Sequence, residues 1–154
     1  MCGIVGYVGK DYSGSKKIYQ GLKNLEYRGY DSCGIAISND KNNQIEIFKS
    51  IGDADNLLKF KIPTSKIGIG HTRWATHGSV NIDNAHPHIS QDKKVYLVHN
   101  GVIENSEEIK NHLKSKGFEF YGETDSEVLV NLISYNYKKY RPCTHIEAIK
   151  KSLR

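Results

Sequence analysis

Short runs of alternating or continuous apolar residues predict the strands of this chain. The runs cover residues 3–8, 33–38, 44–49, 66–71 and 95–99. The first is expected to be a buried strand. The second and third are expected to form a hairpin, because the segment 39–43 between them is rich in turn-forming Asn and Asp. The alternation of Ile45 and Ile47 indicates that the third strand is half buried.

Helical spacing of apolar residues predicts the helices. Residues 14–27 have this spacing at Ile18, Leu22 and Leu25, and residues 53–60 are expected to form a shorter helix. Later helices are predicted to begin at capping boxes, each a polar residue with Glu three positions on: Asn105 with Glu108, Thr124 with Glu127, and Thr144 with Glu147. The first of these is expected to end near Gly117. The second is expected to have an apolar face formed by Val128, Leu129, Leu132 and Ile133. In the third, Ile146, Ile149 and Leu153 follow the helix start.

The predicted elements indicate a mixed α+β fold. Strands and helices are both frequent, and the first long strand pair is joined by a hairpin turn. These features favour a sheet with antiparallel pairs that helices cover. A chain of 154 residues is long enough for one domain with a substantial core.

Composition and charge exclude several classes of protein. The formal net charge is +5, but the lysines are dispersed along polar faces, so we expect no nucleic-acid partner. No apolar run approaches the roughly 20 residues of a membrane helix, and no secretory signal peptide is recognisable. The three cysteines are odd in number and scattered, which is typical of a reducing, cytoplasmic setting. The seven histidines lack metal-ligand spacing, so we expect no metal site and no cofactor.

Cys2 is the strongest chemical candidate, because it directly follows Met1. If Met1 is removed, Cys2 carries a thiol with an ordinary pKa of about 8.5 and an α-amine with one of about 7.7–8.0. Such an amine can act as the general base for the thiol of its own residue. The alternative is that Cys2 is merely the first residue of a buried strand.

Other candidates lie in glycine-punctuated segments near strand ends. Arg73 offers a fork for a carboxylate, although a surface ion pair is the simpler interpretation. Trp74 is either a packing anchor or part of a lid. Asn100 with Gly101 is a turn signal that can also supply the donors of an oxyanion hole. Asp125 either stabilises a helix start or holds an ammonium group.

The motifs that carry this chemistry also carry a family resemblance. They are residues 2–6 (CGIVG), 25–32 (LEYRGYDS), 71–78 (HTRWATHG), 84–88 (NAHPH), 98–105 (VHNGVIEN) and 123–125 (ETD). In this order they resemble the glutaminase domain of the glutamine–fructose-6-phosphate aminotransferase family. This family belongs to the class II, N-terminal-nucleophile glutamine amidotransferases. Its members usually have a small residue such as Ala where this chain has Cys33, which we interpret as a buried side chain.

The resemblance implies a role for each candidate residue in glutamine hydrolysis. Cys2 would attack the side-chain amide, and Asn100 with the Gly101 backbone N–H would stabilise the oxyanion. Arg73, helped by the backbone of Thr76 and His77, would bind the α-carboxylate of glutamine.

The resemblance assigns three further residues to substrate binding and loop support. Asp125 would bind the α-ammonium of glutamine. Trp74 would belong to a loop that closes over glutamine, and Arg28 to a segment beside the nucleophile. The products would be glutamate and ammonia.

The resemblance also implies an αββα sandwich of antiparallel sheets between helical layers, truncated here at the C-terminus. Residues 1–154 would form one incomplete amidotransferase domain without the sugar-isomerase domains that bind fructose 6-phosphate. The full-length family allows a homodimer. The alternative is a catalytically silent fragment or interaction protein that needs a partner chain to complete its sheet.

Overall fold

The computed structural model describes residues 1–42, 44–76 and 78–153, which form two compact units. The first contains residues 1–87 and 98–100, and the second contains residues 88–97 and 101–154. Both combine helices with antiparallel strand pairs, so the predicted α+β class is confirmed. The expectation of one incomplete domain over 1–154 stays a prediction.

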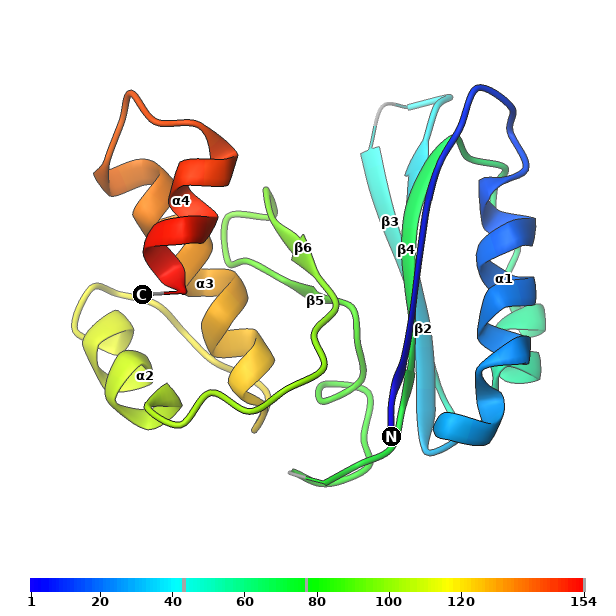
Figure 1. The fold of residues 1–154 in the computed structure, drawn as a ribbon, viewed down its shortest axis with the longest axis horizontal. Helices are drawn as coiled ribbons and strands as arrows, with labels where there is room; N and C mark the ends of the chain where they lie inside the picture. Colours follow the sequence, from blue (N-terminus) through cyan, green and yellow to red (C-terminus); the bar gives the residue numbers. More distant parts are fainter. Residues whose placement is uncertain (43, 77, 154) are drawn as a thin grey trace. The chain divides into compact units, whose positions relative to one another are not determined.

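The first unit is built on a four-stranded antiparallel sheet (Figure 1). Its strands are β1 (Gly3–Val8), β2 (Ser32–Asn39), β3 (Gln44–Ile51) and β4 (Ile67–Arg73), in the order β1-β4-β2-β3. The β2–β3 hairpin confirms the prediction from the turn residues. The prediction of a buried first strand was wrong, because β1 lies at the sheet edge and exposes every second side chain, including Ile4 and Val8.

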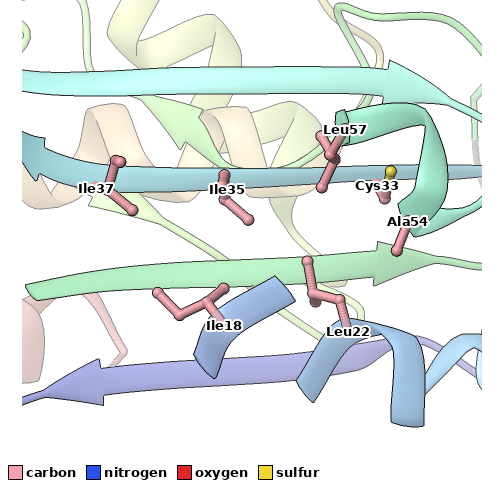
Figure 2. Packing of buried hydrophobic residues seen from close by; sticks show 7 residues of the cluster. All are labelled: Ile18, Leu22, Cys33, Ile35, Ile37, Ala54 and Leu57. Atoms are coloured by element: carbon pink, nitrogen blue, oxygen red, sulfur yellow. The ribbon is translucent and has the colours of Figure 1, made fainter. Parts of the chain in front are cut away.

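Helix α1 (Gly14–Asn24) covers one face of this sheet. The short 3-10 helix η1 (Glu26–Arg28) follows α1, and a second, η2 (Ala54–Lys59), follows β3. The first predicted helix therefore ends three residues early, and the second is of the 3-10 type. Side chains of α1, β2 and η2 meet in the core (Figure 2). The buried members of the cluster are Ile18, Leu22, Cys33, Ile35, Ile37, Ala54 and Leu57.

Glycines on β4 allow α1 to approach the sheet closely. A Cβ at Gly70 would lie 2.5 Å from Ile18 Cγ2, whereas a Cβ at Gly6 on β1 would meet nothing within 4 Å. We expect Gly70→Ala to lower the free energy of unfolding by about 1–3 kcal/mol through overpacking. The matched control Gly6→Ala should change it by less than about 0.5 kcal/mol. Urea unfolding measures both, and equal effects would contradict this account of the α1 packing.

The second unit contains a two-residue strand pair and three helices. These are β5 (His88–Ile89), β6 (Tyr96–Leu97), α2 (Ser106–Lys114), α3 (Asp125–Lys139) and α4 (His145–Ser152). The strand predicted over 95–99 is thus shorter than expected. Residues 98–100, which include Asn100, lie outside any strand and belong to the first unit.

The predicted capping boxes differ in outcome. Thr144 and Glu147 form the complete box at the start of α4. At α3, Thr124 caps the Glu127 N–H, but the Glu127 carboxylate accepts from the Tyr121 and Gly122 N–H groups instead. At α2 the prediction was wrong, because Asn105 has a ψ of 22° and its side chain makes no cap hydrogen bond.

Three of the four residues of the apolar face predicted for α3 are buried, and the fourth, Leu132, is half-buried. Along α3, Val128, Leu129 and Ile133 are buried, and polar residues such as Asn131 are buried as well. On α4 only Ala148 is buried. The apolar side chains of Ile146 and Ile149 are exposed, as is that of Leu153 directly after the helix. Side chains join α4 to its neighbour α3: the His145 ring stacks on Tyr137 with centroids 4.2 Å apart, and Asn136 Nδ2 donates to the Ser152 hydroxyl at 2.9 Å.

Candidate active site around Cys2

The register between β1 and β4 determines what surrounds Cys2. Gly3 pairs with Thr72 and Ile4 with His71, so Cys2 precedes the paired strand opposite the end of β4. Because side chains alternate between the faces of a sheet, Cys2, His71 and Arg73 lie on the face opposite Gly70 and α1. The Trp74 backbone N–H donates to Cys2 Sγ at 3.3 Å, and Sγ is 3.5 Å from the Trp74 carbonyl oxygen. The thiol therefore lies directly at the end of β4.

Asn100 contacts Cys2 from the segment 98–100. Its Nδ2 donates to the Cys2 carbonyl oxygen at 3.1 Å, and its Oδ1 is 2.8 Å from His71 Nε2. Asn100 is exposed, so its amide is accessible to solvent next to the Cys2 backbone. A thiol with an adjacent amide donor is an arrangement suited to attack on a carbonyl carbon, because the donor can stabilise a negative oxygen.

Arg73 is only 4% exposed, and its Nη1 donates to the Ser79 carbonyl oxygen at 3.1 Å. The interpretation of Arg73 as part of a surface ion pair was therefore wrong, because the side chain is buried. Binding of a substrate carboxylate by Arg73 stays a prediction. A buried guanidinium at the end of the strand places positive charge on the same face as Cys2.

The segment after Arg73 is held by residues 29–31. The Asp31 carboxylate accepts from the Ala75 N–H at 2.8 Å, and the Tyr30 ring packs edge-on against Trp74 with centroids 5.5 Å apart. A Cβ at Gly29 would lie 2.7 Å from the Arg73 carbonyl carbon, so the two backbones touch. Trp74 is thus packed on one side while 42% of its surface stays exposed.

The remaining predicted residues of the first unit have varied surroundings. Arg28 donates from Nε to the Tyr27 hydroxyl at 3.0 Å and lies over the Tyr27 ring. Thr76 is exposed. His77 lies outside the described residues.

Gly101 and Asp125 belong to the second unit. Gly101 has a φ of +156°, a conformation that side-chain-bearing residues rarely adopt. The Asp125 carboxylate accepts from the Ile103 N–H at 2.8 Å and from the Ser126 hydroxyl at 3.3 Å. Asp125 thus anchors the 101–105 segment to the start of α3. Its side chain is also partly exposed.

Burial changes the titration of two groups in the first unit. It lowers the pKa of His71 to about 4, with a smaller lowering from the positive Arg73 and an opposing contribution from the hydrogen bond to Asn100. Burial also raises the pKa of Cys33 to about 12. Cys33 is therefore a neutral core residue at physiological pH, as the sequence predicted.

Within the described residues, no group of His, Cys, Asp and Glu side chains is arranged to hold a metal ion. In the same part of the chain, none of the helices has the length and apolar character needed to cross a bilayer.

His71 and Asp31 lie inside the sequence motifs, but no role was predicted for either residue. The available signal was the period of two along the predicted strand, which places His71 on the same face as Arg73. For Asp31 no comparable signal exists, because its contact with Ala75 joins residues 44 positions apart in the chain.

A model of the glutamine amidotransferase domain matches residues 48–140. The glutamine–fructose-6-phosphate aminotransferase of Clostridium acetobutylicum is 49% identical over 98% of this chain and 25% of its own length. The enzyme of the same name from Methanococcus maripaludis is 45% identical, covering 100% of this chain and 26% of its own length. The chain thus spans about a quarter of these relatives.

Solved structures agree with the sequence relatives. The glutamine phosphoribosylpyrophosphate amidotransferase of Bacillus subtilis matches 99% of this chain and 32% of its own, with a TM-score of 0.74 and 28% identity. An allosteric regulatory enzyme of purine biosynthesis matches with a TM-score of 0.78 and 28% identity, over 99% of this chain and 32% of its own. These likenesses confirm the predicted N-terminal-nucleophile fold class. Since the family match covers more than half of its residues, this chain belongs to the glutamine amidotransferase domain family.

Proposed function

We propose that this chain hydrolyses the side-chain amide of glutamine through a thioester on Cys2. The observation that carries the proposal is the contact of Cys2 with Asn100 and with the Trp74 backbone, in a chain of the glutamine amidotransferase family. The ammonia would serve glucosamine 6-phosphate synthesis from fructose 6-phosphate, the reaction class for which the curated relatives are named.

The proposed chemistry begins after removal of Met1. The free α-amine of Cys2 takes the thiol proton, and Sγ attacks the amide carbon of glutamine. Asn100 Nδ2 and the Gly101 N–H donate to the oxyanion of the tetrahedral intermediate. The carbon–nitrogen bond breaks, the amine proton passes to the leaving nitrogen, and ammonia departs. Water then hydrolyses the thioester to glutamate and restores the thiol.

Glutamine would be held by its two charged ends. The buried Arg73 supports binding of the α-carboxylate, together with backbone groups of Thr76 and His77. The Asp125 carboxylate would accept from the α-ammonium. Trp74 would close over the bound amino acid, and Arg28 would support the loop beside it.

Fructose 6-phosphate would bind in the part of the longer relatives that this chain does not match. We further propose a cytoplasmic protein without a nucleic-acid partner, on the basis of its dispersed lysines and scattered cysteines. A homodimer is proposed for a protein of the relatives' full length.

The proposal predicts steady release of glutamate from glutamine by folded protein whose mass shows that Met1 is absent. Asparagine, which is one methylene shorter, is the control substrate and should react at least about tenfold more slowly. No release of glutamate by folded, processed protein would contradict the proposal and favour a catalytically silent fragment. Sedimentation of a compact monomer would in turn argue against a fragment that needs a partner chain.

A further inference from the structure

The amide of Asn100 is held in one orientation by groups on both of its ends. The Cys2 carbonyl oxygen can only accept a hydrogen bond, so the Asn100 atom 3.1 Å from it must be the NH₂ nitrogen. The Asn100 oxygen therefore faces His71 Nε2 at 2.8 Å. Because an amide oxygen cannot donate, His71 must carry its proton on Nε2.

His71 is itself rigidly placed. It is 1% exposed, and its ring stacks on His86 with centroids 4.1 Å apart and planes 13° apart. Its Nδ1 has no hydrogen-bond partner among the described residues. The Nε2–H···Oδ1 bond joins this buried ring to the side chain of Asn100, and the backbone of His99 also interacts with the ring. Burial also keeps the imidazole neutral near pH 7.

The contacts of Asn100 with His71 and with Cys2 determine which atom of its amide faces the substrate. One N–H of the Asn100 amide is used on the Cys2 backbone, and the second stays available for the substrate. If the bond from His71 were lost, the amide could rotate or flip and present its oxygen to the developing oxyanion. An acceptor in that place would repel the negative charge that a donor stabilises.

We propose that His71 is a positioning residue that holds the Asn100 amide with its nitrogen toward the oxyanion. The proposal rests on the proposed glutamine hydrolysis, in which Asn100 is an oxyanion donor. His71 acts on the reaction through Asn100 and takes no proton from the substrate.

Activity measurements test the proposal with a graded pair of substitutions. His71→Leu removes the donor at similar volume and should lower kcat on the order of 10- to 100-fold, with KM changed less than about threefold. His71→Gln, whose Nε2 can donate from nearly the same place, should stay within about threefold of the parent. His112→Leu, an exposed histidine on α2, is the control and should leave kcat unchanged.

A double-mutant cycle separates positioning from general destabilisation. Asn100→Ala should abolish the effect of His71, so that the double variant is no slower than Asn100→Ala alone. Additive losses in kcat would overturn the proposal, as would equal activity of the Leu and Gln variants.

Nitrogen NMR of the unmodified protein tests the contact without any turnover. The spectrum should show the His71 proton on Nε2 and a bare Nδ1, and Asn100→Ala should shift the Nε2 resonance. A proton on Nδ1 would overturn the inference even if glutamine is hydrolysed. If the predicted tautomer is observed in a protein that releases no glutamate, the proposed function is rejected while the contact between His71 and Asn100 stands.

Discussion

Cys2→Ala is expected to reduce glutamate release from glutamine by at least about 10³-fold, because the nucleophile is lost and no thioester can form. The fold should be retained, since Cys2 is half-buried and its thiol is hydrogen-bonded to the Trp74 backbone rather than packed in the core cluster. A coupled glutamate assay, with circular dichroism as the check of folding, measures both results.

The matched control is Cys143→Ala. Cys143 is also a half-buried free cysteine, but it lies between α3 and α4 in the second unit. Its replacement should leave glutamate release within about twofold of the parent. Residual turnover by Cys2→Ala near the parent rate would contradict the thioester mechanism.

Retention of Met1 removes the proposed general base, which is the free α-amine of Cys2. In that form the Cys2 nitrogen is an amide and cannot take the thiol proton. Protein whose intact mass includes Met1 should therefore be nearly inactive, and aminopeptidase treatment should restore the rate.

Arg73→Lys is expected to lower kcat/KM for glutamine by about 10- to 100-fold, mainly through a higher KM. The substitution keeps the positive charge but removes the planar fork that bonds a carboxylate through two N–H groups. Lysine is preferred to a neutral residue because it keeps a positive charge and an N–H donor at this buried position.

A substrate analogue shows whether the lower kcat/KM of Arg73→Lys arises from weaker binding of the α-carboxylate of glutamine. In 4-aminobutanamide a hydrogen replaces that group while the amide and the amine remain. The parent protein should prefer glutamine to this analogue, and Arg73→Lys should reduce the preference about tenfold or more. Arg141→Lys, an exposed arginine outside the site, is the control. An unchanged preference in Arg73→Lys would contradict the proposed role of Arg73.

The sequence predicted the sheet of the first unit well because its signals are local. The turn residues between β2 and β3 specify a hairpin, and Ile18 and Leu22 mark the buried side of α1. Burial of individual strands was less predictable. The apolar content of β1 suggested a buried strand, but a strand at the edge of a sheet exposes part of its apolar side chains.

Capping signals illustrate the limit of local chemistry at helix ends. Thr144 and Glu147 complete their box at α4, where the Glu147 carboxylate accepts from the Thr144 N–H at 2.7 Å. At α3 the Glu127 carboxylate instead accepts from two backbone N–H groups of the preceding turn, because that turn folds back onto it. The same spacing thus leads to different bonds in different surroundings.

The sequence by itself determined the family, the nucleophile candidate and most strands and helices, because these depend on residue type and short-range spacing. Only the tertiary structure decided that Asn100 contacts Cys2 across 98 positions of chain and that His71 orients its amide. It also decided that Arg73 is a buried cation. Such contacts follow from strand register and long-range packing, which bring together residues that are far apart in the chain and choose among several possible neighbours. No local pattern encodes the outcome of that competition.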